Sequence, residues 1–274
     1  MRSLKNYKVY QASSKDILLQ REKYKRVVVK VGASLFAAGK NKWDTVLIKN
    51  IGNQIADLIK EGKEVILVSS GAIALGMSIL KLTNRPQELS SLQATAAIGQ
   101  HELMHVYRRA LDKHGLICAQ LLLTWDDFSA HRYVNAKNTL NTLLKLKCVP
   151  IINENDTVAT EEIKFGDNDK LSAMVAILVN ADLLIILSDV DGLLNQEKKV
   201  IPIVDKITAE IKALACPTSK KTCVGGMITK IQAAHIAVEA GIPCVIANGD
   251  TKGIIRQVAD NPYSFGTIFT TKHK

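Results

Sequence analysis

Short apolar runs alternate with amphipathic stretches along most of the chain, and this alternation limits the possible folds more than any other feature. We expect strands at residues 26–31, 64–68, 116–123, 149–153, 182–188, 244–247 and 266–269. Helical spacing of apolar residues predicts helices at 43–61, 89–114 and 131–147, another after residue 170, and one that opens with residues 224–230. Strands that alternate with helices pair in parallel through right-handed crossovers. The sequence therefore predicts an α/β fold around a mainly parallel sheet.

The chain of 274 residues is 47% apolar, which is enough for a large core, and it has no internal repeat or low-complexity linker. We expect one domain at 26–274 after a basic N-terminal extension at 1–25. The extension contains seven Lys or Arg against Asp16 and Glu22, so it holds half of the net charge of +10. No Lys/Arg run with interleaved aromatics occurs elsewhere, which argues against a nucleic-acid partner.

The five cysteines form no C-x-x-C pair and no His/Cys cluster with zinc spacing, as is typical of thiols in a reducing compartment. No apolar run is long enough to cross a bilayer, and the N-terminus has no apolar signal region. We expect a soluble, cytoplasmic protein without a membrane partner.

Residues 151–170 reverse the sign of charge in this basic chain. They contain six carboxylates: Glu154, Asp156, Glu161, Glu162, Asp167 and Asp169. The stretch lies between an expected strand end and an expected helix start, where ligands bind in open α/β sheets. Asp167 could simply cap the helix. Capping does not explain the further polar groups of Asn153, Asp156, Asn168 and Asp169 on both sides of the loop, which favours a binding site.

A turn of small residues follows the strand at 64–68. Gly71 and Gly76 have the spacing of a Walker A motif, but Met77 occupies the position of the required lysine, so a P-loop is excluded. Two interpretations stay open: a tight strand-to-helix turn, or backbone N–H groups that approach an anion.

The candidate metal sites in the sequence are weak. His101 and His105 lack complementary acidic or cysteine ligands, and the Asp-x-Asp-Gly fragment that begins at Asp189 lacks the later ligands of a calcium loop. Surface histidines and an ordinary turn at a strand end are the favoured interpretations.

Two lysines occupy locally unfavourable positions. Lys30 lies within an apolar strand, where burial of an ammonium group is costly without an anionic partner. Lys230 lies in the first turn of a helix, where the helix dipole disfavours a cation. One polyanion between them would relieve both, and glycine N–H groups at 71 and 225–226 would add donors, so a nucleoside triphosphate is the expected ligand. Phosphoryl transfer needs mainly positioning and charge neutralisation.

The acidic loop then has a separate role. A phosphate site alone would be basic, so Asp156 with Asn153 and Asn168 indicates an acceptor that carries a positive or hydrogen-bond-donating group. An α-ammonium is such a group, and an amino acid acceptor follows.

Several motifs, taken together in this order and spacing, resemble the glutamate 5-kinases of the amino acid kinase superfamily over about residues 26–270. They are Lys30-Val31-Gly32, Ser70-Gly71-Ala72-Ile73, Ile152-Asn153-Glu154-Asn155-Asp156, Gly166-Asp167-Asn168-Asp169, Ser188-Asp189 and Gly225-Gly226-Met227 with Thr229-Lys230. The resemblance implies a three-layer αβα sandwich. It also implies ATP-dependent phosphorylation of the γ-carboxylate of L-glutamate to γ-glutamyl phosphate, the first step of proline biosynthesis.

The resemblance also implies residue roles. Lys30, Asp169 and Lys230 would be catalytic, with Asp169 orienting the two lysines. Glutamate would be bound by Ser70, Gly71, Asn153, Asp156 and Asn168. The nucleotide would be bound by Lys30, Gly32, Ser188, Asp189, Val224, Gly225, Gly226, Met227, Ile228, Thr229 and Lys230. Mg²⁺ would arrive with ATP, so no metal site built by the protein alone is expected. Proline would act as a feedback inhibitor, the enzyme would be a homodimer or homotetramer, and γ-glutamyl phosphate reductase is a candidate partner.

The sequence departs from the family pattern at two places. Ala33 replaces a hydroxyl residue and Cys223-Val224 replaces Gly-Thr, which puts nucleotide contacts in doubt; we also expect no C-terminal PUA domain. Two alternatives stay open. One is a sibling kinase for N-acetylglutamate, aspartate, carbamate, UMP or isopentenyl phosphate, and the other is a non-catalytic amino acid sensor or RNA-associated protein.

Overall fold

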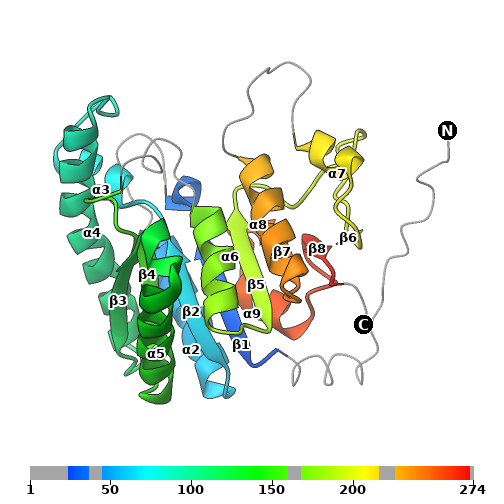
Figure 1. Cartoon of the computed structure of the whole chain (residues 1–274), viewed down its shortest axis with the longest axis horizontal. Helices are drawn as coiled ribbons and strands as arrows, with labels where there is room; N and C mark the ends of the chain where they lie inside the picture. The colour runs from blue at the N-terminus through cyan, green and yellow to red at the C-terminus, as the bar shows by residue number, and fades with distance from the viewer. Residues whose placement is uncertain (1–23, 37–44, 160–167, 216–225, 272–274) are drawn as a thin grey trace.

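The computed structural model describes residues 24–36, 45–159, 168–215 and 226–271. Within these residues lies an eight-stranded sheet with the strand order β3-β4-β2-β1-β5-β7-β8-β6 (Figure 1). The strands are β1 (Arg26–Val31), β2 (Glu64–Ser69), β3 (Cys118–Leu123), β4 (Val149–Glu154), β5 (Leu183–Ser188), β6 (Ile203–Val204), β7 (Cys244–Asn248) and β8 (Thr267–Phe269). The strands from β3 to β7 in this order pair in parallel, and β8 runs antiparallel to β7. The predicted mainly parallel sheet is confirmed.

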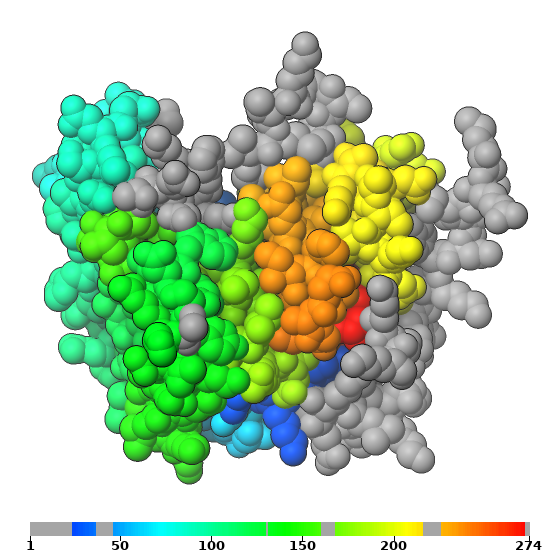
Figure 2. Space-filling model, viewed as in Figure 1, coloured from blue at the N-terminus to red at the C-terminus, as the bar shows by residue number. Residues whose placement is uncertain are grey.

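Helices cover both faces of the sheet. One face packs on α2 (Thr45–Lys60), α4 (Leu89–Asp112) and α9 (Ile254–Asp260), and the other on α5 (Ala130–Lys145), α6 (Asn168–Leu178) and α8 (Met227–Glu239). Figure 2 shows the second face, with α6 as a narrow strip between α5 and α8. Successive residues of β1 alternate between the two cores, as the two-residue period of a strand requires. The three-layer αβα sandwich is confirmed.

For several of the short elements the sequence predicted no bounds, although the short strand β8 was predicted. These are α3 (Ala72–Ile79), α7 (Ala209–Leu214), α9, β6 and the 3-10 turns η1 (Ala33–Phe36) and η2 (Trp125–Phe128). Strand β5 begins at Leu183, one residue later than expected. The Asp182 carboxylate accepts hydrogen bonds from the backbone N–H groups of Lys25 and Arg26. Asp182 thereby holds the start of β1 beside the start of β5.

No helix among the described residues is long and apolar enough to cross a membrane.

The close crossing of α3 and α4 depends on two glycines. A Cβ on Gly99 would lie 1.8 Å from the Ala72 carbonyl oxygen, and a Cβ on Gly76 would lie 1.9 Å from the Thr95 carbonyl oxygen. Larger side chains cannot fit at either contact. Helix α4 therefore fixes the start of α3, which follows directly from the end of β2.

Candidate active site

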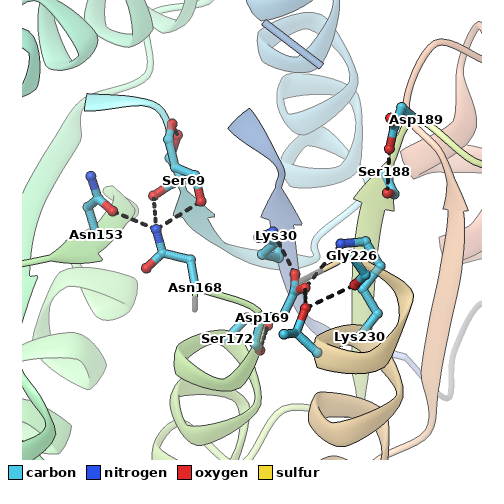
Figure 3. Close-up of polar contacts among 12 residues, drawn as sticks. Lys30, Ser69, Asn153, Asn168, Asp169, Ser172, Ser188, Asp189, Gly226 and Lys230 are labelled. Atoms are coloured by element: carbon cyan, nitrogen blue, oxygen red, sulfur yellow. Dashed lines mark hydrogen bonds and ion pairs between the residues drawn. The ribbon is translucent and has the colours of Figure 1, made fainter. Parts of the chain in front are cut away.

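The carboxyl ends of β1, β2, β4 and β5 meet at one edge of the sheet, as parallel strands require. Helix α6 begins beside them. Its first two residues, Asn168 and Asp169, point to opposite sides, so that each meets a different group of side chains (Figure 3).

Asp169 brings together the two lysines that the sequence singled out. The Lys30 ammonium group on β1 lies 2.5 Å from Asp169 Oδ1, and the Lys230 ammonium group on α8 lies 3.0 Å from Asp169 Oδ2 (Figure 3). Thr229 also donates to Asp169 Oδ2 at 2.7 Å. The residues are 4% (Lys30), 4% (Asp169) and 8% (Lys230) exposed, so this charged cluster is almost removed from solvent.

The charges of the cluster fix the protonation state of its carboxylate. Burial alone would raise the pKa of Asp169, but the Lys30 and Lys230 charges and the hydrogen bonds from Lys30 and Thr229 outweigh burial and lower the pKa to about 2. Asp169 is therefore ionised at neutral pH and is a poor proton acceptor. It can orient the two ammonium groups, and the net charge of the three residues remains +1, which suits a phosphate ligand.

Asn168 belongs to the second group of side chains. Its amide nitrogen donates to Ser70 Oγ at 2.8 Å, to Asn153 Oδ1 at 2.9 Å and to the Ser69 carbonyl oxygen at 3.2 Å. Its amide oxygen is buried and has no hydrogen-bond partner among the described residues. A buried carbonyl oxygen without a partner costs free energy, so this atom points to a ligand that donates a hydrogen bond.

Asp156 and Gly71 lie in the two loops that flank this group. Burial raises the pKa of Asp156 to about 6, and the Arg85 charge opposes the shift. Gly71 caps α3 with a positive φ of 106°, a conformation that favours glycine. The loop that carries Asp156 is held by Ala159, which packs on Leu92 of α4 and whose carbonyl oxygen accepts from Gln93.

The predicted nucleotide residues lie around the start of α8 and the end of β5. Gly226 precedes α8 with φ 71° and ψ −136°, and a Cβ there would meet open space. Thr229 donates to the Gly226 carbonyl oxygen, and Ser188 donates to the exposed Asp189 carboxylate at 3.0 Å. Met227 and Ile228 are half-buried in the first turn of α8. This helix start offers backbone N–H groups to an anion.

Gly32 keeps the backbone next to Lys30 free of side chain. A Cβ on Gly32 would lie 3.3 Å from the Leu187 carbonyl oxygen and 3.7 Å from Lys30 Nζ. Two of the predicted nucleotide residues, Val224 and Gly225, and the acidic residues Glu161, Glu162 and Asp167 lie outside the described residues.

Sequence reasoning missed the residues that support the site from behind. Ser69 Oγ lies 2.9 Å from the hydroxyl oxygen of the fully buried Tyr107 on α4, and burial raises the pKa of that tyrosine well above its usual range. Gln100 on α4 accepts a hydrogen bond from the amide nitrogen of Asn153 at 2.8 Å. These residues are recognisable only once α4 is seen to pack against the ends of β2 and β4. In the sequence, their helical spacing is that of any helix face packed on a core.

The described residues contain no group of three or more His, Cys, Asp or Glu side chains arranged to hold a metal ion.

Comparisons with known proteins give the family. The sequence matches the model of the amino acid kinase family over residues 25–248. It is 47% identical over 251 residues to a glutamate 5-kinase of Caldanaerobacter subterraneus subsp. tengcongensis, covering 89% of this chain and 67% of that protein. It is 46% identical over 265 residues to a glutamate 5-kinase of Clostridium acetobutylicum, covering 93% of this chain and 99% of that protein. A carbamate kinase from Giardia lamblia, solved with AMP-PNP, has the same fold, with a TM-score of 0.62, 20% identity and coverage of 91% of this chain and 99% of that one.

Proposed function

Because this chain belongs to the amino acid kinase family, and within it to the glutamate 5-kinases, we infer that it phosphorylates the γ-carboxylate of L-glutamate with ATP. The product is γ-glutamyl phosphate, and the reaction is the first step of proline biosynthesis. The observation that carries the residue assignment is the convergence of Lys30 and Lys230 on Asp169 beside a buried group with an unpaired acceptor.

Phosphoryl transfer to a carboxylate requires no general base. The γ-carboxylate of glutamate has a pKa of about 4.3, so it is already ionised at neutral pH. One of its oxygens forms a bond to the γ-phosphorus while the bond from that phosphorus to the β,γ-bridging oxygen breaks, and ADP leaves with the electron pair. The low pKa of Asp169 agrees with this scheme, because the residue holds the lysines and takes no proton.

We assign charge neutralisation to Lys30 and Lys230. The phosphoryl group carries negative charge on its peripheral oxygens during transfer, and fixed ammonium groups in a buried site stabilise that charge. Asp169 orients both lysines, so that they need not reorganise during the reaction. Mg²⁺ would enter with ATP and neutralise the phosphates further.

The acceptor is held on the other side of α6. The Asn168 amide oxygen and the Asp156 carboxylate would accept hydrogen bonds from the α-ammonium of glutamate, together with Ser70 and Asn153. The N–H groups after Gly71, at the start of α3, would face a carboxylate of the substrate. The nucleotide would lie along Gly32, Ser188, Asp189 and residues 224–230.

The decisive experiment measures the product directly. The purified chain is incubated with ATP, Mg²⁺, L-glutamate and hydroxylamine, which converts γ-glutamyl phosphate to the γ-hydroxamate. We expect glutamate-dependent hydroxamate and ADP, and a fall in kcat of about 10²-fold to 10³-fold in Lys230→Met, because one charge-stabilising donor is lost. Faster turnover of N-acetylglutamate or UMP than of glutamate would instead identify a sibling kinase, and absence of any ATP turnover would favour the sensor.

Further partners follow from the same chemistry. Proline carries an ammonium and a carboxylate on one carbon as glutamate does, so feedback inhibition at the glutamate site is part of the proposal. The acyl phosphate product is labile in water, which favours direct delivery to γ-glutamyl phosphate reductase. We further propose that the protein forms a homodimer or homotetramer. We also propose that it acts in the cytoplasm.

A further inference from the structure

Carboxamide side chains form a hydrogen-bonded chain from the proposed acceptor site to the edge strand β3. The Asn168 amide nitrogen donates to Asn153 Oδ1 at 2.9 Å. The Asn153 amide nitrogen donates to Gln100 Oε1 at 2.8 Å, and the Gln100 amide nitrogen donates to Gln120 Oε1 at 3.1 Å. The amides of Asn168, Asn153 and Gln100 therefore each donate outward along the chain, away from the site.

Two backbone groups fix the direction of the chain. A backbone N–H can only donate, and that of Glu154 donates to Asn153 Oδ1 at 2.9 Å. A backbone carbonyl oxygen can only accept, and that of Ser69 accepts from the Asn168 amide nitrogen at 3.2 Å. The amide nitrogen of Asn153 must then point away from the site, where Gln100 provides its acceptor.

The direction of the chain decides what the site offers to a ligand. With its nitrogen used on protein acceptors, Asn168 presents its buried oxygen, which has no partner among the residues that the structure describes. An ammonium group fits that oxygen, whereas a second acceptor would be repelled. Reversal of the Asn168 amide would exchange the acceptor for a donor and remove this preference.

We propose that Gln100 is a positioning residue that secures this polarity: its amide oxygen accepts from the Asn153 amide nitrogen and so, together with the Glu154 N–H and the Ser69 carbonyl oxygen, keeps Asn168 presenting an acceptor to the α-ammonium of the substrate. The inference rests on the proposed glutamate kinase activity. Without the Gln100 oxygen, the part-buried amide nitrogen of Asn153 loses its acceptor. Such a group is costly, and the cost weakens the orientation that Asn153 imposes on Asn168.

Kinetics of three variants test the proposal. Gln100→Met has nearly the same length but no comparable acceptor, and we expect its KM for glutamate to rise about tenfold, with the KM for ATP within about twofold of wild type. Gln100→Glu keeps an acceptor and should stay within about twofold for both substrates. Gln120→Met is the matched control, because it makes the same substitution at the exposed end of the chain, where water can replace the lost acceptor.

Glutarate provides a readout that a purely structural role would not change. Glutarate is glutamate without the ammonium group, so it has nothing to donate to the Asn168 oxygen. The preference in kcat/KM for glutamate over glutarate should therefore shrink about tenfold in Gln100→Met and remain unchanged in Gln100→Glu. Thermal unfolding checks that each variant folds. Should Gln100→Met not fold, Gln100→Lys, which opposes a donor to the Asn153 donor, replaces it and should lose the same preference.

The outcomes separate the two proposals. If wild type forms no hydroxamate from L-glutamate, the proposed activity itself is wrong. If wild type is active and Gln100→Met keeps the wild-type KM and preference, or if Gln100→Glu is impaired as strongly as Gln100→Met, the positioning role of Gln100 is overturned.

Discussion

Asp169 is the residue whose negative charge compensates the two buried lysines of the site. Its carboxylate separates two buried ammonium groups, at 2.5 Å from Lys30 and 3.0 Å from Lys230. Removing one partner from a buried ion pair typically costs about 3–5 kcal/mol. Asp169→Asn keeps the shape but leaves both cations without the carboxylate, so we expect the free energy of unfolding to fall by about 3 kcal/mol. Urea unfolding measures this loss, and Lys30→Met, which leaves Asp169 paired with Lys230, should lose less.

The pH dependence of that loss has a definite sign. The pKa of Asp169 is lowered from 3.8 to about 2 in the folded protein. The stabilisation is therefore complete above the unfolded pKa and disappears as pH falls through the folded pKa. The difference in stability between wild type and Asp169→Asn should shrink as pH falls from about 4 toward 2. A difference that stays constant over this range would contradict the ion-pair explanation.

Asp156 gives a second prediction at the scale of one residue. Burial raises its pKa to about 6, and in the proposed role only the ionised carboxylate would attract the ammonium of glutamate. Because kcat/KM reports groups of the free enzyme, kcat/KM for glutamate should fall about tenfold per unit as pH drops below about 6. The substrate carboxylates titrate well below this range. Asp156→Asn should have a lower kcat/KM that no longer changes near pH 6; persistence of the change would assign it to another group.

Helix α4 is the element that supports the acceptor side. It carries Gly99 against the start of α3, Gln100 against Asn153, and Tyr107 against Ser69. Apart from Asn168 at the start of α6, the proposed glutamate residues lie on loops and strand ends, and α4 packs behind them. The geometry of the acceptor site should therefore be sensitive to the position of α4.

Substitution of Gly99 tests this dependence. In Gly99→Ala, the new methyl group would lie 1.8 Å from the Ala72 carbonyl oxygen, so α3 and α4 must separate. We expect the free energy of unfolding to fall by about 2 kcal/mol and the KM for glutamate to rise, because overpacking displaces Ser70 and Gly71. Gly52→Ala in α2 is the matched control. Its methyl group would lie 3.0 Å from Ala110 Cβ, and the helix propensity gained, about 1 kcal/mol, offsets that contact. Equal losses in the two variants would contradict a special role for the α3 and α4 contact.

Some of these elements could be predicted from the sequence, and others could not. The strands β1, β2, β4 and β5 were predictable because their apolar runs are long and their ends carry turn residues or polar side chains. Lys30 was conspicuous because an ammonium group inside such a run needs an anion. The short β6 and α9 leave no pattern long enough to read, and Gln100 and Tyr107 look like ordinary helix residues until the crossing of α4 over the strand ends is known.

At the scale of the whole molecule, two adjacent residues at the start of α6 connect the two groups of side chains in the candidate site. Asn168 reaches Ser70 and Asn153 on the side of β2 and β4, whereas the next residue, Asp169, reaches Lys30 and Lys230 on the side of β1 and α8 (Figure 3). With the proposed assignment, the acceptor and the phosphoryl group would therefore be held at a distance that the start of one helix sets. A helix packed between α5 and α8, with one side in the core, cannot adjust this distance easily (Figure 2).

That fixed distance predicts selectivity for the length of the substrate. L-aspartate offers the same α-ammonium to Asn168 and Asp156, but its side-chain carboxylate is one methylene shorter. When the ammonium is bound, the carboxylate falls more than ~1 Å short of the phosphorus, and a misplacement of this size costs about 10²-fold in rate. We therefore expect L-aspartate to compete with glutamate while its kcat is at least about 10²-fold lower. ADP release with each amino acid alone measures kcat, and inhibition of hydroxamate formation measures competition. An aspartate kcat equal to that of glutamate would mean that the two groups of side chains move relative to each other, and that the start of α6 does not set the distance between them.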